Sequence, residues 1–237
     1  MPLAFVAGAT GFTGREVARG LAARGIKTVA HARPDSPRLE EWRERFAQMG
    51  AETDATAWDE AALTGTFSRL RPDLVFALLG TTRARMKNAA RRSADPKTQD
   101  YTTVDYGLTA MLIRAAKHCG SSPRFVYLSA AGVTPKPGSA YYRARGQAEE
   151  LLRSSGLPYV IARPSFIVGP GRDDRRPGER LGAAMIDGLL DFAALLGAKR
   201  FRDRYASTTN VVLAGALVRL ALDPGAANKI FESENLR

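Results

Sequence analysis

GATGFTG, residues 8–14, directly follows the short apolar run LAFVA, residues 3–7. An apolar strand that leads into closely spaced glycines and then into a helix predicts a dinucleotide-binding turn. One glycine makes the tight turn, another lets the backbone approach a pyrophosphate, and the third lets the helix pack close to the strand. The spacing is G-x-x-G-x-x-G rather than the common G-x-G-x-x-G. A second strand-like run at 27–30 follows the predicted helix 14–24, so this βαβ unit favours a bound nucleotide over a plain strand-to-helix turn.

The length and composition indicate an ordinary globular chain. Its 237 residues, 45% of them hydrophobic, suffice for one sizeable core, and we expect residues 1–237 to form a single domain. The apolar runs are far shorter than the roughly 18 residues that a membrane helix needs, and the N-terminus has no basic leader. Cys119 is the single cysteine, so no internal disulfide can form, which favours a cytoplasmic location. His118 and Cys119 are two residues only, and we predict no metal site.

The charge of the chain is strongly positive. Lys and Arg total 35 against 24 Asp and Glu, which gives a formal net charge of +11. Such an excess is typical of nucleic-acid-binding proteins, but an anionic phosphorylated cofactor also favours it. The densest basic cluster consists of Arg83, Arg85, Lys87, Arg91, Arg92 and Lys97. It contains no aromatic side chain on which a base could stack, so we expect a small-molecule substrate, and neither nucleic acid nor a membrane as partner.

Strand-like and helical patterns alternate up to Pro164. The strand-like runs are 2–7, 27–31, 51–55, 73–80, 124–129 and 158–162. The helical patterns lie at 14–24, 37–49, 59–70, 102–119 and 141–155, and the last two are the expected faces of a homodimer. This alternation predicts a doubly wound parallel sheet, the Rossmann fold, with ligands beyond the carboxyl ends of the strands. We expect residues 165–207 to form a small lobe that caps the substrate side, and 210–222 to form a closing helix.

The end of the second strand bears on the identity of the nucleotide. NAD sites usually place Asp or Glu there to bond the ribose 2′-hydroxyl, whereas this chain reads HARP at 31–34 and has no carboxylate before Asp35. Arg33 and Arg15 could instead pair with a 2′-phosphate, so NADP is predicted over NAD; otherwise both are solvated surface arginines. Asp54, after the third strand, could accept from the adenine amino group or cap the next helix. The predicted cofactor-binding residues are Gly8, Thr10, Gly11, Phe12, Thr13, Gly14, Arg15, Arg33, Asp54, Ala55, Gly80, Thr81, Arg163 and Pro164.

A serine, a tyrosine and a cation are predicted to form a hydride-transfer site. Ser129 ends the fifth strand, and Tyr141 follows twelve residues later in a helix that also carries Arg145 at the i+4 position. The serine hydroxyl would polarise a carbonyl and Tyr141 would give or take the proton. Arg145 would hold the nicotinamide ribose and lower the pKa of the tyrosine from its usual value of about 10. The simpler interpretation makes Ser129 an ordinary strand-end residue, and Tyr141 and Tyr142 partly buried helix aromatics.

Together these motifs resemble the short-chain dehydrogenase/reductase superfamily in its atypical and extended branches. The glycine turn, the strand end LSAAG at 128–132, the Tyr141 helix and Arg163-Pro164 follow the family's order over nearly the whole chain. RPSFIVG at 163–169, followed by RPGER, is most similar to the Tat-interacting-protein-like and NmrA-like, NAD(P)H-binding subgroup. The resemblance implies an NADP(H)-bound Rossmann domain with a short C-terminal lobe. One departure is Arg145, which stands where the family's Tyr-x-x-x-Lys pattern has lysine, and which cannot release a proton.

Three functions fit these residues. The first is an NADP(H)-dependent oxidoreductase acting on a small carbonyl or alcohol, with a pocket roofed by 82–100 and 165–205. In that pocket Arg83, Arg85 and Arg172 would favour an anionic substrate. The second is a redox-sensing regulator that binds NADP(H) with little catalysis, which the lysine-to-arginine departure favours. The third is a nucleotide-sugar epimerase or dehydratase, for which the C-terminal part of the chain is short.

Overall fold

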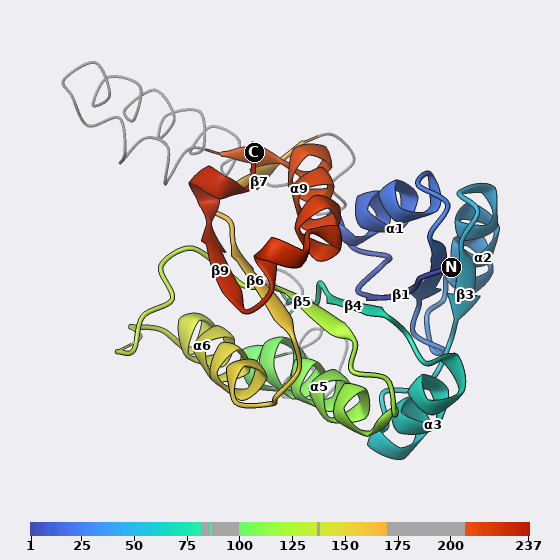
Figure 1. Ribbon diagram of the computed structural model, residues 1–237, viewed down its shortest axis with the longest axis horizontal. Coiled ribbons are helices and arrows are strands. Elements are labelled where there is room, and N and C mark those ends of the chain that lie inside the picture. Colours follow the sequence, from blue (N-terminus) through green and yellow to red (C-terminus); the bar gives the residue numbers. More distant parts are fainter. Residues whose placement is uncertain (82–85, 87–99, 137, 170–206) are drawn as a thin grey trace.

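Seven parallel strands form the central sheet of the computed structural model, in which residues 1–81, 86, 100–136, 138–169 and 207–237 are described (Figure 1). In sheet order they are β3 (Glu52–Asp54), β2 (Lys27–His31), β1 (Leu3–Ala7), β4 (Leu74–Ala77), β5 (Arg124–Leu128), β6 (Tyr159–Arg163) and β9 (Lys229–Glu232). Every neighbouring pair is parallel. The strand order reverses between β1 and β4, and doubly wound sheets bind their ligands beside such a switch point.

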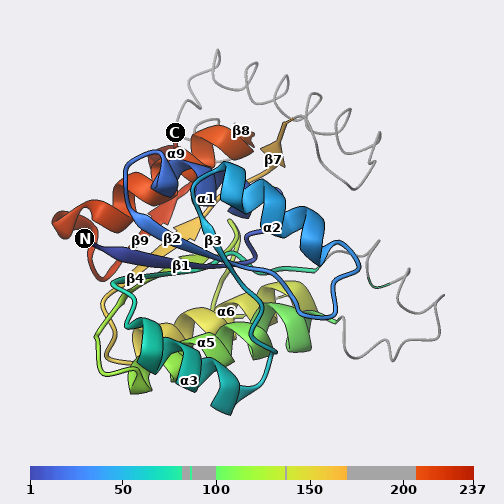
Figure 2. The ribbon, with the colours of Figure 1, turned by 90° about the vertical axis from the view of Figure 1, so that its right-hand side faces the viewer.

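Helices cover both faces of the sheet (Figure 2). One face carries α1 (Gly14–Ala22), α2 (Leu39–Gln48) and α9 (Asn210–Leu222). The other carries α3 (Glu60–Leu70), α5 (Leu108–His118) and α6 (Ala140–Arg153), with the π-helix η2 (Tyr101–Gly107) leading into α5. The short elements are the paired strands β7 (Ile167–Val168) and β8 (Thr208–Thr209), and the 3₁₀ turns η3 (Pro224–Ala226) and η4 (Ser233–Asn235).

Two apolar layers hold this arrangement together. All four residues of β4 are buried, as are four of the five in β1, because strands covered on both faces contact apolar side chains on each side. Phe46 of α2 and Leu217 of α9 pack into one layer, and Phe67 of α3 and Ile113 of α5 pack into the other. The predicted Rossmann fold is confirmed, and the predicted strands and helices are present with ends shifted by a few residues.

Strand β9 is the main element that the sequence pattern did not predict. It is only four residues long, and its first two side chains, Lys229 and Ile230, are exposed. It lies at the edge of the sheet and pairs with β6, so tertiary contact rather than local pattern makes it a strand. The predicted closing helix 210–222 is confirmed as α9.

Part of the predicted substrate side lies outside the described residues. This applies to most of the lobe at 165–207, to the roof segment 82–100 except for residues 86 and 100, and to the whole basic cluster between residues 83 and 97. The start of the lobe is described, and its strand β7 pairs with β8, which directly follows the lobe. Among the helices that the structure describes, none is long and apolar enough to cross a membrane.

Candidate functional site

The glycine turn joins β1 to α1 at the switch point. Gly8 has a φ of +81°, and a Cβ atom there would lie 2.6 Å from the Leu78 carbonyl oxygen, just beyond β4. A Cβ atom at Gly14 would lie 2.1 Å from the Gly8 carbonyl oxygen, so only glycine lets α1 begin this close to β1. The Gly11 N–H closes the turn by donating to that same oxygen at 2.9 Å.

The start of α1 is suited to an anion. Thr13 is the N-cap residue, but its side chain does not cap the helix. The first N–H groups of a helix lack intrahelical partners and carry the positive end of the helix dipole, which together favour phosphate. A close-packed glycine turn leading into this helix start therefore fits the pyrophosphate of a dinucleotide.

The residues after β2 are a buried histidine and an accessible arginine. His31 is buried, its Nε2 lies 2.8 Å from the Thr56 carbonyl oxygen, and its ring packs edge-on against Trp58. Burial lowers the pKa of His31, so the imidazole is neutral at physiological pH. The Arg33 guanidinium is half exposed and has a weak contact, 3.5 Å, with Asp35. Arg33 is therefore available to an anionic ligand.

Arg15 and Asp54 occupy different environments. The Arg15 guanidinium lies 5.5 Å from the centre of the Phe12 ring, and its Nε is 3.7 Å from Glu16. The Asp54 carboxylate accepts from the Thr56 N–H at 3.0 Å and from the Thr56 hydroxyl at 2.9 Å, closing the turn after β3. Asp54 therefore does not cap the next helix.

Asp59 is the residue that caps α3. Its side chain accepts from the Ala62 N–H at 2.9 Å. The sequence contained a usable signal, because Asp59 is the first residue of the helical pattern 59–70 and Asp is a preferred N-cap residue. Capping was one of the two roles predicted for Asp54, whereas the residue that caps the helix is Asp59.

Arg145 is buried at the centre of the predicted catalytic region. Its Nη2 lies 2.7 Å from Oδ1 of Asp105, and the guanidinium donates to the carbonyl oxygens of Leu79 and Leu128. A Cβ atom at Gly80 would lie 2.6 Å from the same Nη2, so glycine is needed for this approach. Arg145 thus ties α6 to the carboxyl ends of β4 and β5.

Asp105 was missed by the sequence analysis. It is fully buried in η2, and its Oδ2 accepts from the Thr81 N–H at 3.0 Å. It thereby brings the predicted residues Gly80 and Thr81 together with Arg145. The available signal was a carboxylate within a predicted apolar helix, which is rarely buried without a partner. Burial raises the pKa of Asp105, against the lowering effect of the neighbouring guanidinium.

Two polar atoms beside this ion pair, Thr81 Oγ1 and Arg145 Nε, are buried and have no hydrogen-bond partner among the described residues. The Tyr127 hydroxyl is also buried there, and it interacts with the Arg145 guanidinium. Burial raises the pKa of Tyr127 to about 12, so its phenol keeps its proton. Buried polar groups are nearly always hydrogen-bonded, and orphaned ones gathered in one place indicate a position where a ligand or water is expected.

Tyr141 lies beside the same guanidinium. The Arg145 Cζ is 5.4 Å from the centre of the Tyr141 ring, which also packs edge-on against Tyr101 and Tyr142. The predicted lowering of the Tyr141 pKa by Arg145 is present, but burial outweighs it, and the net pKa is raised. In the protein without ligand, Tyr141 is therefore a protonated phenol at neutral pH.

Ser129 belongs to a second buried network. Its hydroxyl donates to Oε1 of Glu149 at 2.5 Å, and Glu149 forms a two-pronged ion pair with Arg163, at 3.0 and 2.6 Å. Arg163 also contacts Glu232 of β9 at 3.1 Å. Glu149 thus brings the predicted residues Ser129 and Arg163 together, and neither Glu149 nor Glu232 was among the predicted site residues. The hydroxyl proton of Ser129 is committed to Glu149.

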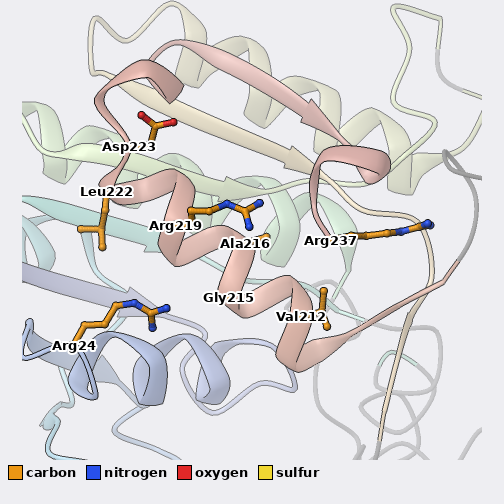
Figure 3. A pocket seen from close by; sticks show the side chains of 8 residues that line it. All are labelled: Arg24, Val212, Gly215, Ala216, Arg219, Leu222, Asp223 and Arg237. Carbon is orange, nitrogen blue, oxygen red and sulfur yellow. The ribbon is translucent and has the colours of Figure 1, made fainter.

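Pro164 and a surface groove complete the description. The Pro164 carbonyl oxygen accepts from the Ala131 N–H at 2.9 Å, which joins the ends of β5 and β6. An open groove of about 640 Å³ lies along α9, beside Arg24, which follows α1 (Figure 3). Its lining residues are Arg24, Val212, Gly215, Ala216, Arg219, Leu222, Asp223 and Arg237. None of the predicted site residues is among them, so this groove is separate from the switch point.

Some predictions about the site cannot be placed. Arg83, Arg85 and Arg172, expected to favour an anionic substrate, lie outside the described residues. Within the described part of the chain, no group of three or more His, Cys, Asp or Glu side chains could hold a metal ion.

Comparison with known proteins identifies the family. The sequence profile of the family described as NAD(P)H-binding matches residues 8–184, which is most of the chain. The chain belongs to the NAD(P)H-binding family. The match begins at the first glycine of the turn, and the predicted membership of an NAD(P)-binding Rossmann superfamily is confirmed.

Two fungal relatives correct the predicted location. Protein fmp52, mitochondrial, of Emericella nidulans is 26% identical over 212 residues, covering 86% of this chain and 81% of that protein. Protein fmp52-1, mitochondrial, of Aspergillus terreus is 30% identical over 109 residues, covering 46% and 42%. The predicted cytoplasmic location is wrong on this finding, because the relatives are named as mitochondrial. A single cysteine cannot form an internal disulfide in any compartment, so it could not distinguish between them.

Solved structures agree with the NAD(P)H-binding assignment at the level of the fold. WbmH of Bordetella bronchiseptica, in complex with NAD⁺, has a TM-score of 0.66 at 22% identity, covering 98% of this chain and 76% of that one. UDP-glucose 4-epimerase of Brucella ovis, in complex with NAD, has a TM-score of 0.65 at 17% identity, covering 98% and 77%. The family and the fold together support a nicotinamide nucleotide as cofactor.

Replacing Glu149 with glutamine tests the second network. The substitution leaves the partly buried Arg163 with one carboxylate partner, so it should lower the free energy of unfolding by about 2 kcal/mol, a usual value for hydrogen bonds to a charged group. Urea denaturation measures the change. Glu150→Gln is the matched control, because Glu150 is exposed on the same helix and its contact with Arg153 should contribute no more than about 0.5 kcal/mol. Equal losses in the two variants would contradict a structural role for the network.

Proposed function

We propose that this chain is an NADP(H)-dependent oxidoreductase of the short-chain dehydrogenase/reductase type that acts on a small carbonyl or alcohol. The observation that carries the proposal is the cluster of Tyr141, Arg145 and Asp105 at the carboxyl ends of β4 and β5. It combines a protonated phenol, a permanent cation and orphaned polar atoms beside the switch point at which nucleotides bind. A structural core would need none of these polar groups, and leaving them unpaired is costly.

Arg33 supports NADP over NAD. It follows β2 at the place where NAD-binding proteins usually carry an acidic residue, and its guanidinium is half exposed with only a weak contact to Asp35. The arginine fork matches the geometry of a phosphate group, so Arg33 would bind the 2′-phosphate. The uncapped start of α1 would bind the pyrophosphate.

In the proposed reaction Tyr141 would donate the proton and Arg145 would stabilise the charge left on the tyrosine. NADPH, when bound, supplies a hydride. Tyr141 would donate its phenol proton to the oxygen of the reduced carbonyl, which would give the alcohol and leave the tyrosine as a phenolate. Arg145 stabilises that phenolate by its charge, and Asp105 holds the guanidinium in position. Because Arg145 keeps its own protons, Tyr141 has to recover its proton from solvent rather than through residue 145.

Ser129 has a conditional role in this scheme. Its proton is donated to Glu149, so polarising a carbonyl requires the hydroxyl to turn from the carboxylate to the substrate oxygen. The same bond favours a second candidate function, a regulator that binds NADP(H) without turnover. In that case Ser129 and Arg145 serve only to hold the sheet ends together. Turnover of bound NADPH with a panel of small aldehydes and ketones distinguishes the enzyme from the regulator.

Removing the Arg33 side chain should weaken binding of NADPH roughly tenfold or more while leaving NADH binding nearly unchanged, because only NADPH carries the 2′-phosphate. Fluorescence titration of the purified protein measures both dissociation constants. Arg43→Ala is the control, since Arg43 is an exposed arginine of α2 paired with Glu40. A similar loss for both nucleotides, or for neither, would refute the assignment of Arg33.

Removing the phenol hydroxyl in Tyr141→Phe should lower the reductase rate roughly 100-fold or more, because the proton donor is lost. Cofactor affinity should change little. Steady-state kinetics and nucleotide titration separate the two effects. Tyr142→Phe is the matched control, since its ring neighbours Tyr141 and has no assigned role. If the two variants had the same rate, the catalytic role of Tyr141 would be wrong.

The pH dependence follows from the raised pKa of Tyr141. Reduction needs the protonated phenol, and burial shifts the pKa above its ordinary value of about 10. The carbonyl-reduction rate at saturating NADPH should therefore stay level from about pH 6 to 9, and fall only at higher pH as the phenol loses its proton. A midpoint near pH 7 in the wild type, absent in Tyr141→Phe, would show that the phenol has a lowered pKa instead.

A further inference from the structure

The C-terminal segment makes a direct hydrogen bond to the dinucleotide-binding turn. Nδ2 of Asn210, the first residue of α9, donates to the Phe12 carbonyl oxygen at 3.1 Å, across 198 positions of sequence. Asn210 is buried, with 2% of its surface exposed. The reverse orientation of the amide would set two carbonyl oxygens against each other, so the donating nitrogen has to face Phe12.

The contact between Asn210 and Phe12 also depends on a glycine beside it. Gly169, at the end of β7, has a φ of +146°. A Cβ atom there would lie 2.5 Å from Oδ1 of Asn210 and 3.1 Å from the Phe12 ring. Three segments, the glycine turn, the end of β7 and the start of α9, therefore meet at one point that admits no larger residue.

Burying the amide of Asn210 is unfavourable if the side chain serves only for packing. Its Oδ1 is buried and has no hydrogen-bond partner within the described residues. An orphaned buried carbonyl costs free energy, which an apolar side chain of similar size would avoid. The half of the amide that is satisfied is the half that holds the turn.

We propose that Asn210 is a positioning residue for the dinucleotide-binding turn. The peptide between Phe12 and Thr13 is planar and trans, so its carbonyl and its N–H point in opposite directions. The Phe12 oxygen points toward Asn210, so the Thr13 N–H at the start of α1 points away from α9. The hydrogen bond from Asn210 fixes this orientation before a nucleotide binds. This inference rests on the family's nucleotide binding and is independent of the proposed reductase activity.

The test compares two adjacent variants. Asn210→Ala should weaken binding of NADPH or NADH, whichever binds more tightly, by roughly three- to tenfold, the value of one hydrogen bond. Thr209→Ala is the matched control. Its hydroxyl caps α9 by accepting from the Val212 N–H, so its loss should lower Tm and leave Kd unchanged. Asn210→Asp keeps the shape of the side chain but removes the donor, and should bind as weakly as Asn210→Ala.

Isothermal titration calorimetry well below Tm gives Kd, and thermal unfolding gives Tm. If Asn210→Ala lowered Tm like Thr209→Ala and left Kd unchanged, Asn210 would be only structural and the proposal overturned. Hydrogen exchange in the wild type covers the case in which the variants do not fold. Added nucleotide should slow exchange in residues 8–16 and 208–214 together, and protection of the turn alone would also overturn the proposal.

Discussion

The lack of room for a Cβ atom at Gly8 and Gly14 is the constraint on which the rest of the site depends. Both positions face backbone atoms rather than flexible side chains, so no neighbour can yield without moving a strand. Strands β1 and β4 and helix α1 are therefore held at fixed distances at the switch point. The start of α1, the Arg145 cluster beyond β4 and the contact with Asn210 are all arranged around that turn.

Helix α6 adds a second constraint through opposite charges one turn apart. Arg145 and Glu149 are both buried, and each finds its partner on a remote element, Asp105 in η2 and Arg163 at the end of β6. Burying a charge without its partner is strongly unfavourable, so α6 can dock in one register only. The cation then lies beneath the ends of β4 and β5, and the anion lies between β5 and β6. Arg145 lies beside the Tyr141 ring, and Glu149 holds the hydroxyl of Ser129, so both charges contact residues of the proposed reaction.

The fold was predictable because its signals are local. Continuous apolar runs define buried strands, and the glycine turn defines the first βαβ unit, so the doubly wound sheet follows from the sequence pattern. Strand β9 was not predictable in this way, because its half-exposed residues gain their strand conformation from pairing with β6. Tyr141, Arg145 and Ser129 were predicted as site residues, but three polar contacts were not predicted: Asp105 with Arg145, Glu149 with Ser129, and Asn210 with Phe12. Each of Asp105, Glu149 and Asn210 is a polar residue within a helix, and its significance depends on an element far away in the chain.

The contact between Arg163 and Glu232 affects the order in which the sheet folds. Glu232 lies on β9, which follows all other strands of the central sheet in sequence, and it supplies the outer carboxylate of the network that contains Arg163 and Ser129. During synthesis the earlier strands can pair as they emerge, but Arg163 has only one of its two carboxylate partners, Glu149, until β9 arrives. Contacts this distant in sequence form late and slow the closing step of folding. A chain stalled or clipped before β9 would hold a nearly finished sheet with an open edge at β6, and such an edge is prone to pair with other chains.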